Sequence, residues 1–551
     1  GMEILQRGPV HDVVVIGSGA SGAMNAHALV GHGVRVLMLD AGWKFDRSES
    51  WAHVLPFEAD RRRREGEAPP RFRLDDREQP YLTPEGRPFQ LWRTWGGGGK
   101  TNVWGRVSLR MSDLDFSGPE REGWGIPWPI RYADIAPYYD RVEQLIGVTG
   151  GDDDSDSLPG SRHHLPPVKP RCAEVILSRT AGQLGIPAVP IRRAVLTRPH
   201  GGRPACHYCG SCGSGCRTAS FFNATDYLLM PALETGRLEI VSGAVAARVL
   251  TGDDGRADGV QYFERESGAE RVVRARTVVV AASAMDSTRI LLNSRSRRHP
   301  AGLGNGNDQV GRNYCEQVRF HRFGFLPQLF GQGYTNDDGI GGGHVYIPRF
   351  NHRLTGLDYV GGFGIQLWGN GCQTTGVNVA ELMPGLEFGA GFKRRVRERY
   401  PALAALHPYG EILPRPDNRV TVDEARTDRY GVPLMRVDVT FGDNERRMVR
   451  HMHEVADEIL HTAGAETVPS SPDEHDPPGA AIHEHGTVRM GDDPARSVRN
   501  RFNRMHEVDN VLVVDGSSFT SASEKNPTLT ILALAWRAGD HLAEELRSGR
   551  L

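Results

Sequence analysis

Two histidines, His483 and His485, stand two residues apart in the stretch AAIHEHGTVRMG, directly before a Gly-Thr pair. A neutral imidazole, with a pKa of about 6.5, can accept a proton from an alcohol at physiological pH. In an extended stretch both side chains would point to the same side and line one cavity. A metal site is disfavoured because no further ligands stand nearby. The pair therefore indicates a catalytic base, and for His485 a hydrogen-bonded structural role is equally open.

The base must be positioned by regular secondary structure, and a glycine-rich turn near the N-terminus indicates such a unit. A strand, Val13 to Ile16, runs into Gly17-x-Gly19-x-x-Gly22, followed by a helical pattern and a second strand ending at Asp40. Gly17 permits a tight turn, and Gly19 lets the backbone approach a pyrophosphate at the helix N-terminus. Asp40 is placed to accept hydrogen bonds from a ribose. The unit predicts dinucleotide binding but does not separate FAD from NAD.

Two internal segments extend this unit. The segment Trp92 to Arg110 contains four successive glycines, which let the backbone lie against a flat or charged group, although a flexible hinge would look the same. Later, a strand from Thr277 to Ala282 turns through small residues into a helix, as a second dinucleotide-binding crossover would.

The C-terminal part repeats the pattern. A strand, Val511 to Val514, ends at Asp515-Gly516, and a helix begins near Thr528 after Asn526-Pro527. Proline in the first helical turn is a normal start signal. We therefore expect this loop to meet the same cofactor as the N-terminal turn.

These segments resemble the glucose-methanol-choline (GMC) flavin oxidoreductases over nearly the whole chain. The resemblance rests on the N-terminal fingerprint, GGGGKTNVW, the stretches Trp128 to Val148 and Glu411 to Val422, and the C-terminal signature. The stretch WPIRYADIAPYYDRVE and the ending GT-RMG…NPTLT are most similar to the branch with pyranose 2-oxidase, gluconate 2-dehydrogenase and glucoside 3-dehydrogenase. The resemblance implies FAD and oxidation of a CH–OH group to a carbonyl, on a sugar or glycoside.

The resemblance also implies roles for single residues. The family's catalytic histidine stands three residues before the Gly of Gly-Thr, which is His483 here, and its partner at the last helix is Asn526. The base takes the hydroxyl proton while hydride goes to flavin N5, and the Asn526 amide donates to the developing alkoxide. His485 is a candidate substrate or flavin contact. The implied cofactor-binding residues are Gly17, Gly19, Gly22, Asp40, Gly98, Gly99, Thr101, Asn102, Val103, Val245, Asp515 and Gly516.

Two positions depart from the family pattern. Some members bond FAD covalently through a histidine, and Val103 stands at that position. Because valine has no nucleophile, we expect non-covalent FAD. Ser283 replaces the usual glycine in the strand-helix turn, which leaves the local phosphate or ribose contact open.

Four of the seven cysteines fall in CHYCGSCGSGC with the spacing C-x2-C-x2-C-x3-C: Cys206, Cys209, Cys212 and Cys216. This spacing resembles a bacterial iron–sulfur run, although Arg217 replaces the usual proline after the fourth cysteine. GMC proteins often carry a similar loop near the flavin, where small thiols can simply pack. Packing thiols are favoured, an iron–sulfur cluster is the main alternative, and zinc or a disulfide is formally open.

The distribution of these motifs predicts an α/β fold with a Rossmann-like FAD domain of the GMC type. That domain must be assembled from residues 8–50, 90–112, 200–318 and 470–551, because all these segments reach one cofactor. The other segments, 51–89, 113–199 and 319–469, should form a discontinuous substrate domain. The alternating pattern of 411–441 predicts an antiparallel sheet that roofs the flavin.

The composition disfavours a nucleic-acid-binding protein and a membrane-spanning protein. The 66 basic and 68 acidic residues are spread along the chain, which disfavours nucleic acid. The basic run at Arg61 is followed by acids and is interpreted as a solvated loop. We expect no membrane span, and a cytoplasmic protein without its own signal peptide, although export with a partner subunit stays open.

Three alternative functions stay open. The substrate could be a non-sugar alcohol; the protein could be an NAD-dependent dehydrogenase, which the C-terminal signature disfavours; or it could be a flavin electron-transfer protein that oxidises no alcohol. The electron acceptor is oxygen or a redox partner.

Overall fold

The computed structural model describes residues 8–332, 339–369, 376–383, 385 and 388–551. A seven-stranded sheet has the N-terminal fingerprint strand near its centre. The strands that carry the predicted turns are parallel to it, and β5–β7 continue as an antiparallel meander. The order is β4 (Leu238–Val241), β2 (Val36–Leu39), β1 (Val10–Ile16), β7 (Glu270–Val280), β6 (Ala257–Glu264) and β5 (Ala244–Thr251), with β16 (Val511–Val513) beside β7.

This first sheet is buried on both faces, which explains the unbroken apolar run in β1. Val13 and Val15 belong to one hydrophobic cluster, and Val14 and Ile16 belong to another. Helices α2 (Ala20–Gly31) and α13 (Thr528–Arg547) contribute to the first cluster, and α9 (Ala284–Asn293) to the second. The sheet therefore has the two-sided helical cover typical of dinucleotide-binding folds.

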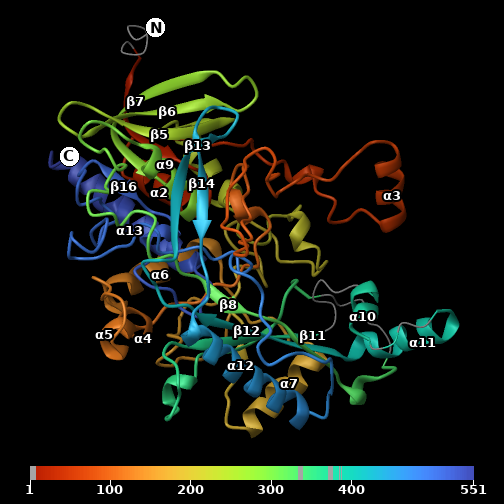
Figure 1. The fold of residues 1–551 in the computed structure, drawn as a ribbon. Helices are drawn as coiled ribbons and strands as arrows, with labels where there is room; N and C mark the ends of the chain where they lie inside the picture. Colours follow the sequence, from red (N-terminus) through yellow and green to blue (C-terminus); the bar gives the residue numbers. More distant parts are fainter. Residues whose placement is uncertain (1–7, 333–338, 370–375, 384, 386–387) are drawn as a thin grey trace.

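A second, antiparallel sheet lies in the lower part of the view in Figure 1, with helices α7 (Cys172–Gln183) and α12 (Asp443–Thr462) against it. Its longest strand, β12, is buried at all nine positions. The order is β15 (Glu466–Thr467), β9 (Arg322–Phe325), β12 (Leu403–Glu411), β11 (Phe363–Gly369), β10 (Val345–Ile347) and β3 (Val189–Pro190), with β8 (Gln317–Arg319) on β12.

The antiparallel sheet predicted over 411–441 is divided between two structures. Glu411 ends β12 of the second sheet, whereas β13 (Arg419–Thr427) and β14 (Pro433–Asp438) form a separate two-stranded ribbon. In Figure 1 this ribbon runs between the two sheets. Alternation within one segment predicts strands, but it does not state which distant strands will pair with them.

The predicted C-terminal elements agree closely with the structure. Helix α13 begins at Thr528 as expected. No helix among the described residues has the length and apolar character that crossing a membrane requires. The remaining α-helices are α3 (Pro56–Arg64), α4 (Asp113–Phe116), α5 (Gly118–Glu122), α6 (Tyr132–Ile146), α8 (Met230–Glu234), α10 (Gly376–Leu382) and α11 (Ala390–Arg399).

Candidate active site

The glycine fingerprint forms the turn between β1 and α2 at one end of a large cavity. Gly17 has a φ of +104°, and a Cβ there would lie 2.2 Å from the Ala281 carbonyl oxygen. A Cβ on Gly22 would lie 2.0 Å from the Gly17 oxygen, whereas a Cβ on Gly19 would meet nothing within 4 Å. Gly17 and Gly22 therefore allow close packing, and Gly19 leaves the helix N-terminus open to the cavity.

The same end of the cavity has the polar groups that a dinucleotide requires. Helix α2 has no side-chain cap and no acidic residue in its first turn, so its first N–H groups are available to an anion. Asp40 lines the cavity after β2, and its carboxylate accepts a 2.7 Å hydrogen bond from the Ser18 hydroxyl. Burial raises the pKa of Asp40, although the Ser18 bond opposes the shift.

The glycine run and the C-terminal signature supply the other walls of the cavity, where Gly99, Thr101, Val245, Asp515 and Gly516 all line it. The neighbouring Gly98, Asn102 and Val103 belong to the same short 3-10 turn. Gly98 has a φ of +83°, and the Asn102 amide donates to the Gly97 carbonyl at 2.9 Å. These two residues shape the turn that presents Gly99 and Thr101.

The cavity fits an FAD molecule by its chemistry. Its lining includes an open helix N-terminus, the buried carboxylate of Asp40, a glycine-rich segment, His483 and Pro527. A pyrophosphate would meet the α2 N–H groups, and the ribose hydroxyls would meet Asp40. The distant segments predicted to reach one cofactor do line one cavity.

His483 lines this cavity, and Asn526 lies beside it. Asn526 Nδ2 is 3.4 Å from His483 Nε2. On its other side, His483 Nδ1 lies 2.6 Å from Gln317 Oε1 of β8. Asn526 Oδ1 in turn accepts a 3.2 Å hydrogen bond from Gln366 Nε2 of β11. A chain of four side chains therefore runs from one strand of the second sheet to another.

The hydrogen bonds of Gln317 decide which nitrogen of His483 carries the proton. Gln317 Nε2 donates to the Ser523 carbonyl at 2.7 Å and to the Lys525 carbonyl at 3.0 Å. Its Oε1 is therefore the end that faces the ring, and an amide oxygen can only accept. His483 Nδ1 must be the N–H, so Nε2 has the free lone pair. Gln366 orients the Asn526 amide in the same way, with its N–H₂ toward His483 Nε2.

Electrostatics keeps this imidazole neutral. Burial lowers the pKa of His483 well below its usual value, and neighbouring His485, Arg319 and Lys100 lower it further. A neutral ring with a lone pair on Nε2 is the form that a general base needs.

His485 does not share the environment of His483. Its ring is buried and stacks on Phe519 with centroids 4.6 Å apart, and its Nδ1 lies 3.3 Å from the Cys315 carbonyl oxygen. Ile482 has a φ of +58°, and Glu484 lines the cavity beside His483. His483 is among the residues that line the cavity, and His485 is not. The buried Nε2 of His485 has no hydrogen-bond partner among the described residues, so its contact with substrate or flavin stays a prediction.

A buried ionic network holds the loop that carries Asn526. Lys525 Nζ lies 2.8 Å from Asp115 Oδ2 and 2.7 Å from Glu524 Oε1. Burial alone would lower the pKa of Lys525, but these two carboxylates raise it above its usual value. The loop is therefore fixed through charge pairs directly before the Asn526 side chain.

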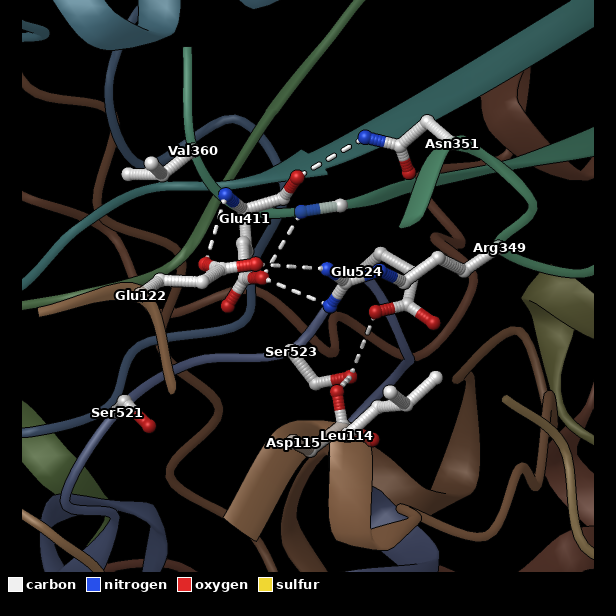
Figure 2. Close-up of polar contacts among 12 residues, drawn as sticks. Leu114, Asp115, Glu122, Arg349, Asn351, Val360, Glu411, Ser521, Ser523 and Glu524 are labelled. Atoms are coloured by element: carbon white, nitrogen blue, oxygen red, sulfur yellow. Dashed lines mark hydrogen bonds and ion pairs between the residues drawn. The ribbon is translucent and has the colours of Figure 1, made fainter. Parts of the chain in front are cut away.

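A second group of charges adjoins this network. Figure 2 shows Arg349 near the carboxylates of Glu122 and Glu411, and Ser523 beside Asp115 and Glu524. Arg349 lies 3.2 Å from Glu122 and 3.4 Å from Glu411. The Ser523 hydroxyl donates to Asp115 at 2.8 Å. All of these groups except Glu122 are buried, so their positions depend on one another.

Sequence reasoning missed Gln317 and Gln366. Gln366 is the single polar residue of strand β11, FGIQLWG, whereas Gln317 opens the short strand β8, QVR, which also contains Arg319. An isolated glutamine in a buried strand is a signal that a partner exists, but it does not name the partner.

The four cysteines of the loop are free thiols that lie near one another. Cys212 is buried against Phe221 and Ile340, with Cys206 and Cys216 packed beside it. Burial raises the pKa of Cys206 to about 11. Trp104, which lines the cavity, packs against the same cluster. The loop thus supports the cavity wall from behind, and the iron–sulfur cluster stays a prediction.

Comparison with known proteins places these features in context. Residues 11–319 and 414–535 match the N- and C-terminal family models described as GMC oxidoreductase. The chain is 33% identical over 550 residues to a 6'''-hydroxyparomomycin C oxidase of Streptomyces lividus, covering 98% of this chain and 93% of that protein. It is 31% identical to a 2-methyl-1,2-propanediol dehydrogenase of Mycolicibacterium austroafricanum, covering 97% and 95%. An FAD-dependent oxidoreductase from Chaetomium thermophilum has a similar fold, with a TM-score of 0.66 at 15% identity over 98% and 100% of the two chains.

Proposed function

The chain belongs to the GMC oxidoreductase family and is an FAD-dependent enzyme that oxidises CH–OH groups, and we propose that a sugar or glycoside is its substrate, with His483 as the base. The observation that carries the base assignment is the contact between Nε2 of His483, which lines the cavity, and Asn526 Nδ2. A substrate hydroxyl that enters beside these two groups would replace their contact, donating to Nε2 and accepting from the Asn526 amide.

The chemistry follows from these two groups. The substrate O–H donates to His483 Nε2, which takes the proton as the C–H bond breaks. The Asn526 amide donates to the oxygen while it carries negative charge. Bound FAD supplies the acceptor for the hydride. The proton stays on Nε2 of a ring whose Nδ1–H donates to Gln317 Oε1.

Support for a sugar or glycoside comes from the relatives. Among them are a fructose dehydrogenase large subunit and a C-glycoside 3-oxidase, whereas the 2-methyl-1,2-propanediol dehydrogenase is named for a small diol. The test is an anaerobic screen of monosaccharides, glycosides and primary alcohols, with bleaching of the flavin band as the readout. Bleaching by simple alcohols alone would contradict the sugar proposal.

The electron acceptor is the second open part of the proposal. One relative is named an oxidase and another a dehydrogenase, so oxygen and a redox partner are both compatible with the family. Stopped-flow reoxidation of the reduced enzyme by oxygen and by artificial acceptors distinguishes the two.

We expect FAD to be bound without a covalent bond. Val103 stands at the position of the covalent histidine in some family members and has no nucleophile. Acid or heat precipitation should therefore release the flavin into the supernatant, where its absorbance is measured. Flavin that stays with the washed, denatured chain would contradict this expectation.

Gln317 should control the pH dependence of flavin reduction. In the native enzyme the rate should stay level down to a pH below about 6.5, because His483 must be unprotonated and its pKa is lowered. In Gln317→Glu a carboxylate faces Nδ1–H and raises that pKa, so the acid limb should move to higher pH.

The matched variant Gln317→Met removes the acceptor without adding charge. It should slow flavin reduction on the order of tenfold, since the ring can then place its proton on Nε2. Rapid-reaction measurements across pH check both variants. An unmoved acid limb in Gln317→Glu would show that Gln317 is a packing residue only.

A further inference from the structure

A cluster of metal-ligand side chains lies outside the cavity, where the cysteine loop meets the segment before α3. His53 Nε2 and His207 Nε2 are 3.0 Å apart, and their rings are tilted by 34°. Cys209 Sγ and one ring nitrogen of each histidine all lie within 4.8 Å of one another. Both histidines are exposed and Cys209 is half-buried. Three ligand atoms from two distant segments therefore surround one point at the surface.

The two segments are held together independently of these three side chains. The Ser50 hydroxyl donates to the Ser214 carbonyl at 2.7 Å. Arg47 Nε lies 2.8 Å from Asp226 Oδ2, and its guanidinium also donates to the Arg217 carbonyl. Because the backbone around the cluster is already tied, little ordering is required when a ligand binds there.

The ligand set selects the kind of ion. One sulfur and two imidazole nitrogens suit Zn²⁺, which prefers mixed nitrogen and sulfur ligands, and they do not suit Mg²⁺ or Ca²⁺. Two ring nitrogens facing each other can share only one hydrogen when both rings are neutral.

We propose that His53, His207 and Cys209 bind one Zn²⁺ ion, with the fourth position open to water. On binding, the Cys209 thiol releases its proton to solvent and coordinates as thiolate. The ion would tie segment 47–53 to the loop whose inner thiols pack behind Trp104 of the cavity wall. Its role is a structural clip, and the assignment does not depend on the alcohol-oxidising function.

The test uses the FAD-loaded enzyme incubated with Zn²⁺ and then desalted. We expect about one zinc per chain by elemental analysis, and a first shell of sulfur and nitrogen in X-ray absorption spectra. Cys209→Ser and His207→Ala should each lower retained zinc at least tenfold. Zinc should also protect Cys209 from alkylation, which peptide mass spectrometry detects.

Two matched variants distinguish this site from a four-thiol metal site and from zinc on scattered surface histidines. Cys206→Ser should keep full zinc, because Cys206 lies outside the trio; equal loss in Cys206→Ser and Cys209→Ser would assign the metal to the four thiols and overturn the proposal. His163→Ala controls for surface histidines, since His163 is exposed elsewhere. Retained zinc well below one-tenth of an ion per native chain would leave the His53–His207 contact as a hydrogen bond only.

Discussion

Replacing His483 with alanine should slow flavin reduction by roughly a hundredfold or more while FAD stays bound. Gln317 holds Nδ1–H of the imidazole, which leaves the Nε2 lone pair facing the Asn526 amide. Its ring is one part of a long cavity wall, so the cofactor keeps its other contacts. Anaerobic stopped-flow absorbance with a proven substrate measures the rate, and the flavin-to-protein ratio measures FAD content.

His461→Ala is the matched control, because His461 is exposed near the end of α12 and is not among the residues that line the cavity. The flavin of the His461→Ala variant should be reduced by substrate at the native rate. A near-native rate for His483→Ala with full FAD would exclude His483 as the base. Loss of FAD in that variant would instead assign His483 to cofactor binding.

Replacing Lys525 with methionine should lower the free energy of unfolding by about 3–5 kcal/mol. Lys525 is buried between Asp115 and Glu524, and its removal leaves two buried carboxylates without their cation. The pKa of Asp115 is lowered in the native protein, against the effect of burial, by Lys525 and its hydrogen bond. The stabilisation is fully present at pH values above the pKa that Asp115 has in the unfolded protein. It is lost as the pH falls through the lower pKa that Asp115 has in the folded protein.

Urea denaturation at neutral pH measures the loss. Lys525→Arg keeps the charge and should recover much of the stability, whereas Lys169→Met, at an exposed position, should change little. If Lys525→Met unfolds at the same urea concentration as Lys169→Met, the network does not stabilise the loop. Asn526 would then be positioned by Gln317 and Gln366 alone.

The features of the fold that depend on local backbone geometry could be predicted from the sequence. Positions 17 and 22 need glycine because a Cβ there would clash with nearby backbone atoms. Asp40 comes directly after β2, the strand that pairs with β1. Thr528 starts the last helix after Asn526-Pro527 for an equally local reason. Such features reach only a few residues along the chain, so their types and spacing are visible in the sequence.

What the sequence by itself determined was therefore the dinucleotide-binding turn, the apolar strands and the start of the last helix. The tertiary structure alone decided which distant side chains meet. Gln317 is 166 residues from His483, and Gln366 is 160 residues from Asn526. Likewise, His207 meets His53 across 154 residues. The sheets set these contacts, because the pairing of strands and the turn at Ile482 fix where each side chain points. No pattern within one segment contains that information.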